Sequence, residues 1–320
     1  MVLRISSVAL RVLIEYYQFM LSFGVLGGIS ASMVFTPSVS VATHWFQKRR
    51  ALATGIIATA GSIGGIIFPQ IFNALAPKIG FGWAIRTLGF IVLFFCAVGA
   101  LFQKSRLKPK KGTRKTVDIR VLREISFTLT TAAIVFADIG ALIPVTYLTS
   151  YAHANSMTIE QSYTLMSILN AASVLGRLLP AYAADRYGRF NTMVVTTAIS
   201  AILTVSLWLR SGSNQAAIIS YTVLFGFWSG SAISMSPVCI AQISKTEDFG
   251  KRYGTAYAFI GIGVLVSLPI AGQVLKAQTH DGKEEYWGLI VFCGVAYGLS
   301  TALFALARGF LTGWKFKKVF

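Results

Sequence analysis

The sequence predicts an all-α, polytopic membrane protein with about nine transmembrane helices. Of its 320 residues, 55% are hydrophobic and 12% are charged, and the mean hydropathy is +0.66. Soluble domains average about 25% charged residues, so this chain is far more apolar than that class. Long apolar runs also recur along the chain, and the lysines and arginines fall mainly between them. A membrane protein with many spans is the fold class that satisfies all three observations.

Nine runs are long enough for the roughly 20 helical residues that cross about 30 Å of hydrocarbon. They cover residues 19–43, 51–73, 82–103, 125–149, 160–183, 191–210, 215–241, 252–275 and 285–307. The connections on one side of these spans hold 21 Lys and Arg, whereas those on the other side hold five. Because basic connections stay in the cytoplasm, this asymmetry predicts a cytoplasmic C-terminus.

The chain divides into three parts at its most basic connection. Residues 1–102 form a first, incomplete helical bundle, and residues 125–320 form a six-helix bundle with a short basic tail. Residues 103–124 between them are polar, basic and interrupted by proline and glycine, which is typical of a linker. Its position between spans predicts a cytoplasmic linker that orients the chain.

The span at 51–73 is expected to pack closely against another helix. It follows the basic cluster Lys48, Arg49 and Arg50, which cannot enter hydrocarbon cheaply and so marks the cytoplasmic end. Small residues four positions apart let a second backbone approach a membrane helix. The glycines expected to do so here are Gly61, Gly64 and Gly65.

An internal repeat relates the two halves of the chain. Three pairs of helix-shaping residues are offset by 200 positions: Pro37 and Pro237, Gly61 and Gly261, and Pro69 and Pro269. By this offset Gly261 and Gly263 are second-copy packing glycines, and the spans from 125 to about 210 lack first-copy partners. The repeat therefore predicts a first bundle without its first three helices.

Arg177 is the one cation well inside a predicted span. Such a charge is costly unless it faces a partner or a water-filled cavity, although an arginine can also extend to a nearby membrane face. Asn170 lies two turns earlier, and either a hydrogen bond to a ligand or one to another helix would explain it. Asp138, on the preceding span at similar depth, is either a proton-exchanging carboxylate or a lone acid facing water.

Enzyme, metal and nucleic-acid functions are not expected. His44, His153 and His280 are scattered without the spacing of a metal site or a catalytic triad. No complete dinucleotide or phosphate-loop motif occurs, so no cofactor is predicted. The net charge of +18 is distributed among the connections and not gathered into the patch that binds nucleic acid.

Several motifs resemble the monocarboxylate-transporter branch of the major facilitator superfamily. HWFQKRRALATGIIATAG at 44–61 resembles that branch's fifth-helix signature. GRLLPAYAADRYGRFN at 176–191 and GIGVLVSLPIAG at 261–272 are most similar to fungal members. EYYQFMLSFGVLGGISASMVFTPS and FGWAIRTLGF are supporting matches. The resemblance implies the major facilitator fold, with the nine spans as helices four to twelve.

The resemblance also implies a transport function and a site. A small organic solute, a monocarboxylate or another organic anion, would cross by alternating access, with or without a proton. Arg177 matches the eighth-helix arginine that holds an anionic substrate, and Ser173 stands where animal members have an aspartate. The cytoplasmic gating residues would be Asp185, Arg186, Gly188 and Arg189, together with Lys48, Arg49 and Arg50.

The alternative is a shortened chain that does not transport and only associates with a membrane. For the transporter, the plasma membrane and an organelle membrane such as the vacuole both fit. The oligomeric state is not predicted.

Overall fold

The computed structural model describes residues 16–104, 106, 118–280 and 283–315. The predicted segment 1–15, most of the linker 103–124 and the end of the basic tail lie outside this part of the chain. Within it, nine helices are long and apolar enough to cross a membrane, as the sequence predicts.

Three of these spans precede the linker. The first runs from Met20 to Trp45 and consists of the π-helical segment η1 (Met20–Leu26) and α3 (Gly27–Trp45), after the short α2 (Tyr16–Phe19). The others are α4 (Arg50–Ile79) and α5 (Phe81–Phe102). Gly80 joins α4 to α5 with a φ of +79°, a conformation that favours glycine.

Six spans follow the linker. They are formed by α6 (Ile125–Ala154), α7 (Ile159–Tyr187), the bent unit α8–η3–α9, α10 (Gln215–Gln242), α11 (Phe249–Ala277) and α12 (Trp287–Thr312). The bent unit comprises α8 (Arg189–Leu203), a π-helical segment η3 (Thr204–Trp208) and α9 (Leu209–Ser211).

The observed helices are longer than the predicted spans at several ends. For example, α4 extends to Ile79 and α7 to Tyr187, where the sequence predicts ends at residues 73 and 183. Lys78 and Arg186 therefore lie inside helices, at their last turns. A prediction from the length of the apolar run leaves such turns out of the span. They can still be helical, because charged side chains at helix ends extend to the aqueous face.

Two short elements in the connections are not predicted by the sequence. The end of the linker forms a 3₁₀ helix, η2 (Ile119–Arg123). The side chain of Asp118 caps it by accepting a hydrogen bond from the backbone N–H of Arg120. The connection before α12 contains a two-stranded antiparallel pair, β1 (Thr279–His280) and β2 (Lys283–Glu284). Both are too short to alter the all-α architecture.

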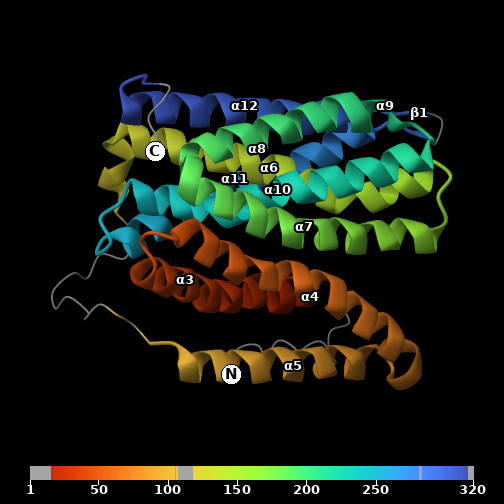
Figure 1. The fold of residues 1–320 in the computed structure, drawn as a ribbon. Coiled ribbons are helices and arrows are strands. Elements are labelled where there is room, and N and C mark those ends of the chain that lie inside the picture. The colour runs from red at the N-terminus through yellow and green to blue at the C-terminus, as the bar shows by residue number, and fades with distance from the viewer. Residues whose placement is uncertain (1–15, 105, 107–117, 281–282, 316–320) are drawn as a thin grey trace.

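The helices run side by side. The N-terminus of α4 and the C-termini of α7, α10 and α12 lie together at one end of the molecule (Figure 1). We call this the basic end; it contains the connections 46–49 and 243–248 and η2. The β1–β2 pair marks the opposite end. In Figure 1, α4 lies beside α7 near the basic end and diverges from it toward the α4–α5 turn.

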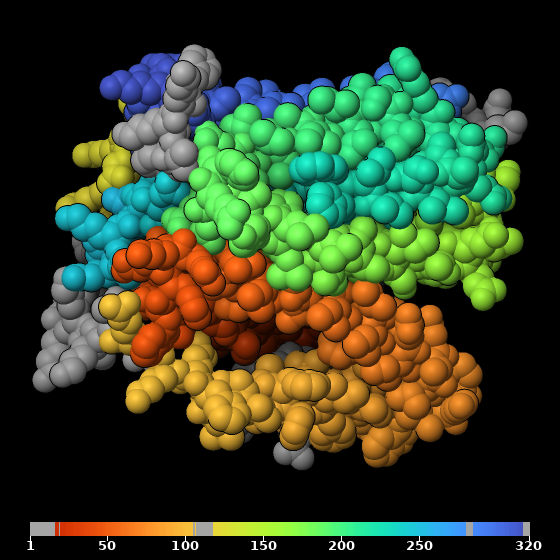
Figure 2. All heavy atoms as spheres, in the orientation of Figure 1, coloured from red at the N-terminus to blue at the C-terminus, as the bar shows by residue number. Residues whose placement is uncertain are grey.

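Most of the buried core belongs to the six helices after the linker. Near the basic end it includes Phe127, Phe190 and Phe304, and toward the opposite end Trp208 and Tyr221. By contrast, the most apolar stretch of α5 has none of its residues buried, and this helix packs along α4. In the space-filling view, α3–α5 form the smaller, lower mass of the molecule (Figure 2). A membrane helix can expose such a surface because hydrocarbon surrounds it.

Candidate functional site

Three polar side chains of α7 face α4. Asn170, Ser173 and Arg177 are three and seven positions apart, which places them on one face of a helix with 3.6 residues per turn. The sequence predicts this grouping, and the structure shows which helix lies opposite it.

Arg177 contacts the backbone of α4. Its Nη1 group donates a hydrogen bond to the carbonyl oxygen of Ala58. A methyl group added at Gly61 would lie 3.2 Å from the same nitrogen. The absence of a side chain at Gly61 therefore leaves the space into which the guanidinium extends.

The other two side chains also meet α4. The hydroxyl of Ser62 donates to that of Ser173 across 3.2 Å. A methyl group at Gly65 would lie only 2.8 Å from Oδ1 of Asn170, so the amide packs directly against this glycine. Asn170 itself donates to the carbonyl oxygen of Met166, 2.9 Å away.

Arg177 has no carboxylate partner among the described ion pairs. Its side chain is partly buried, and its Nε atom is buried without an acceptor. A guanidinium usually donates to an acceptor at each of its edges, so an unpaired buried N–H is costly. This arrangement suits a group that takes up an anionic partner from outside the protein.

No described hydrogen bond or ion pair joins Asp138 to Arg177. Asp138, on α6, is partly buried and interacts electrostatically with Tyr253 and Tyr257 of α11 and Tyr297 of α12. The rings of Tyr253 and Tyr257 lie 4.4 Å apart, one turn from each other on α11. The sequence analysis does not single out these tyrosines. For Tyr253 and Tyr257, the spacing of four residues was the available signal.

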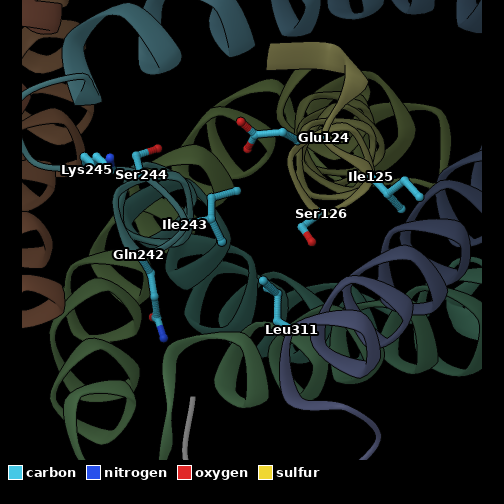
Figure 3. A pocket seen from close by; sticks show the side chains of 8 residues that line it. All are labelled: Glu124, Ile125, Ser126, Gln242, Ile243, Ser244, Lys245 and Leu311. Atoms are coloured by element: carbon cyan, nitrogen blue, oxygen red, sulfur yellow. The ribbon is translucent and has the colours of Figure 1, made fainter. Parts of the chain in front are cut away.

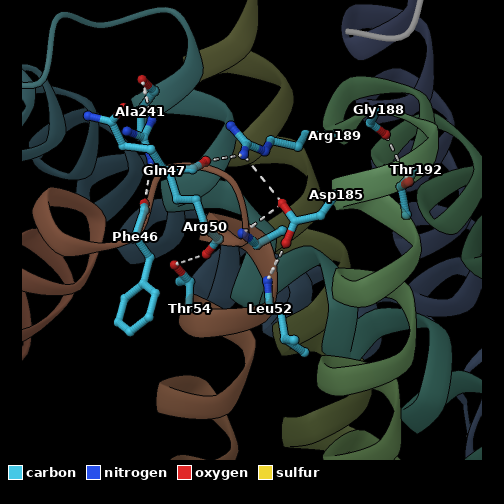
Figure 4. Close-up of polar contacts among 11 residues, drawn as sticks. Phe46, Gln47, Arg50, Leu52, Thr54, Asp185, Gly188, Arg189, Thr192 and Ala241 are labelled. Atoms are coloured by element: carbon cyan, nitrogen blue, oxygen red, sulfur yellow. Dashed lines mark hydrogen bonds and ion pairs between the residues drawn. The ribbon is translucent and has the colours of Figure 1, made fainter.

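At the basic end, Asp185 of α7 caps α4. Its carboxylate accepts from the backbone N–H groups of Ala51 at 3.1 Å and Leu52 at 3.0 Å (Figure 4). These are N–H groups of the first turn, where the helix dipole favours negative charge. Arg189 holds the same carboxylate at 3.3 Å and donates to the carbonyl oxygen of Gln47 at 3.1 Å.

Arg50 adds a contact from α4 to α10. It is 8% exposed and donates to the carbonyl oxygen of Ala241 at 3.1 Å and to that of Phe46 at 3.3 Å. Together, Asp185, Arg189 and Arg50 fasten the start of α4 to the helices after the linker. We call these three residues the end latch.

The remaining residues of the expected gating set differ in position. Lys48, Arg49 and Arg186 are exposed, and Arg186 lies over the ring of Tyr182 at 4.7 Å. Gly188 forms the α7–α8 turn with a φ of +99°, and its carbonyl oxygen accepts from Thr192. Its contribution is the backbone turn that places Arg189 within reach of Asp185.

The second-copy glycines and Gly64 do not share one environment. A methyl group at Gly263 would lie 2.5 Å from Val135 of α6, so this glycine sits in a helix contact. A methyl at Gly261 would meet nothing within 4 Å, and one at Gly64 would meet only Phe68 of its own helix. The expectation that all of them mediate close packing is therefore wrong for Gly261 and Gly64 in the described part of the chain.

A pocket near the ends of three helices does not include Arg177 in its lining. It has a volume of about 600 Å³ and opens at the basic end among the ends of α6, α10 and α12 (Figure 3). Glu124 at its rim pairs with Arg252 across 2.6 Å. Among the described residues, no group of three or more His, Cys, Asp and Glu could hold a metal ion.

Comparisons with known proteins agree with this architecture. The family model of the Major Facilitator Superfamily matches residues 1–220 and 128–312. An MFS-type transporter of Gibberella moniliformis is 38% identical over 299 residues, covering 93% of this chain and 71% of that protein. The riboflavin transporter MCH5 of Saccharomyces cerevisiae is 33% identical over 324 residues, covering 94% of this chain and 62% of that protein.

Solved structures show the same fold at low sequence identity. FucP in the outward conformation gives a TM-score of 0.69 at 14% identity, covering 96% of this chain and 80% of that one. The human organic anion transporter MFSD10 gives 0.65 at 16% identity, covering 96% and 74%. With nine membrane-length helices and this family match, the chain is a multi-pass integral membrane protein that belongs to the Major Facilitator Superfamily.

Proposed function

We propose that the chain moves a small organic anion across a membrane by alternating access and that Arg177 holds the anion. The observation that carries this proposal is the guanidinium itself. It lies within a span, between the helices that precede and follow the linker, without a carboxylate partner among the described ion pairs and with one buried N–H unpaired. A charge kept in that position at such a cost is best explained by a charged ligand.

The chemistry of the neighbouring groups supports a carboxylate. Guanidinium and carboxylate groups are planar and form two parallel hydrogen bonds. Asn170 and Ser173, on the same face, add neutral groups that would hydrogen-bond a hydroxyl or carbonyl of the solute. A monocarboxylate fits the motif resemblance at 44–61 and 176–191. The names of relatives, which include a riboflavin transporter and an aspyridones efflux protein, favour keeping the wider class of organic anions.

Proton coupling would use Asp138. Asp138 is a carboxylate inside a span, and the hydroxyl-bearing rings that interact with it, those of Tyr253, Tyr257 and Tyr297, come from two other helices. A carboxylate in such a place can take up and release a proton as the helices around it move. No described hydrogen bond or ion pair joins Asp138 to Arg177, so proton and anion would bind at separate places. Their coupling would then pass through helix movement and not through a direct ion pair.

The proposed orientation has the basic end and the C-terminus in the cytoplasm. The support is the distribution of 21 Lys and Arg against five. In that orientation the end latch closes the cytoplasmic side, and α4 and α7 diverge toward the outside (Figure 1). The plasma membrane and the vacuolar membrane both remain compatible with this arrangement.

The test is binding of anionic and neutral forms of the same solute to the purified chain. Lactate is compared with lactamide, and benzoate with benzamide, by thermal shift and by uptake into proteoliposomes. We expect the carboxylates to stabilise the protein and the amides to do nothing. Arg177→Gln should remove the response, and Arg177→Lys should restore part of it because a point charge cannot grip both oxygens.

Arg86→Gln is the matched control, since Arg86 lies over Trp83 near the start of α5, away from α7. This variant should respond to carboxylates like the wild type. Equal responses to carboxylates and amides, or an unchanged response in Arg177→Gln, would overturn the proposal.

A further inference from the structure

We infer that α4 carries a seat for the anion-binding side chains of α7, and that the seat competes with the substrate. The seat consists of the Ala58 carbonyl, Gly61, Ser62 and Gly65. This inference rests on the proposed function and deepens it, because it assigns positioning roles to residues of a second helix. It also states how binding of the anion is linked to separation of α4 from α7.

The seat follows from the antiparallel register of the two helices. Ala58 and Gly61 lie against Arg177, Ser62 lies against Ser173, and Gly65 lies against Asn170. As residue numbers rise on α4, those of the α7 partners fall. Every residue assigned to the anion on α7 therefore has its own position on α4.

The Ala58 carbonyl occupies a hydrogen bond that a substrate carboxylate would use. It accepts from Nη1 of Arg177. A charged acceptor makes a stronger bond to a guanidinium than a neutral carbonyl does, so a carboxylate can displace it. The Nε atom, on another edge of the guanidinium, is buried in this contact, so a carboxylate cannot reach it while the two helices are in contact.

The contact brings α4 close to the groups that would bind an anion. A single methyl group at Gly61 would already lie 3.2 Å from Nη1, and one at Gly65 would lie 2.8 to 2.9 Å from the amide of Asn170. Close approach of the helices and occupation by a carboxylate thus exclude one another. A ligand that binds only one of two states shifts the population toward that state.

The seat is continuous with the end latch. From the basic end inward, the contacts between α4 and α7 run from Ala51 and Leu52 with Asp185 to Gly65 with Asn170. An anion that removes Arg177 from Ala58 therefore weakens the inner part of the same closure that Asp185 completes. Binding and opening of the basic end become linked through this contact.

The first test compares three glycine-to-alanine variants of α4. Gly61→Ala and Gly65→Ala introduce a methyl group into the seat, whereas Gly64→Ala introduces it beside Phe68 of the same helix. The two seat variants should disfavour the seated state and tighten lactate binding by roughly fivefold or more, the lower range of usual coupling factors. Gly64→Ala should bind like the wild type. Equal or weaker binding in both seat variants relative to Gly64→Ala would overturn the inference.

The second test uses the wild-type seat and so does not depend on how the variants fold. Spin labels at positions 48 and 186, which are exposed on either side of the closure, report the separation of α4 and α7 at the basic end. Saturating lactate should lengthen the distance distribution, and lactamide should leave it unchanged. If lactate binds through Arg177 without changing this distance, the seat is refuted while the proposed function stands. If lactate does not bind at all, both fail.

Discussion

At the scale of single residues, the sequence identifies the charged members of the site but not their partners. Arg177 and Asn170 are predictable because polar residues within an apolar span are visible in the residue order, and Ser173 is predicted from the family resemblance. The partner of Arg177 is a backbone carbonyl of α4, and every residue has such a carbonyl, so the sequence carries no signal for it. Tyr297, beside Asp138, lies more than 150 positions away along the chain.

Asp138→Asn is expected to uncouple transport from protons. In the wild type, acidifying the side from which substrate is taken up should raise uptake, because more Asp138 is protonated before the helices move. The amide of asparagine cannot bind and release a proton, so uptake by the variant should be nearly independent of external pH. The measurement is initial uptake into proteoliposomes at a series of external pH values.

Glu160→Gln is the control for that measurement, because Glu160 is exposed in the first turn of α7. It should retain the pH profile of the wild type. A profile in Asp138→Asn that matches the wild type would remove the carboxylate from the proton step.

At the scale of elements, turns and caps decide how the helix ends meet. The motif at 185–189 predicts that an aspartate and arginines join helix ends. The structure adds that the aspartate binds the first-turn N–H groups of α4, a detail that depends on a contact 134 positions apart. The residue order does not show which helix N-terminus will lie beside Asp185, so the N–H groups of α4 could not be predicted as its partners.

Asp185→Asn should weaken the attachment of α4. The change removes the negative charge at the helix N-terminus and one of two acceptor oxygens, which corresponds to about 1–2 kcal/mol of stability. We expect a lower melting temperature in detergent. Asp248→Asn is the matched control, since Asp248 precedes α11 but its side chain makes no capping hydrogen bond. Equal melting temperatures for the two variants would show that the cap contributes nothing.

Gly188→Ala should destabilise the α7–α8 turn. A φ of +99° with a ψ of 138° lies in a region almost confined to glycine, so alanine is strained there by roughly 1–3 kcal/mol. Gly254→Ala, in the second turn of α11 with nothing within 4 Å of the added methyl, should be neutral or stabilising. The melting temperatures of the two variants decide the point, and a stable Gly188→Ala would contradict it.

At the scale of the whole molecule, the 200-residue offset agrees with the order of the helices. Pro37 and Pro237 lie inside α3 and α10, and Pro69 and Pro269 lie inside α4 and α11. What the offset could not predict is the unequal environment of the paired glycines. Gly61 lies against α7, whereas a methyl at Gly261 would meet nothing within 4 Å in the described residues. Equivalent sequence positions acquire different surroundings because packing depends on which helices lie next to them.

Orientation is the whole-molecule property that the charge distribution predicts most directly. Single cysteines at positions 48 and 276 lie on opposite ends of the bundle, in exposed positions, and both replace lysines. In a background with Cys96 replaced by serine, an impermeant maleimide should label position 276 from outside intact cells, and position 48 only after permeabilisation. This follows because basic connections are retained on the cytoplasmic side.

The two cysteines serve as controls for each other, because on any one side of the membrane only one of them is expected to react. For a protein resident in an internal membrane, the comparison is made on sealed organelles, where position 48 should react and position 276 should not. Labelling of position 276 from the cytosol would reverse the orientation. The end latch would then close the opposite side of the membrane, and the anion would meet Arg177 from the cytoplasm.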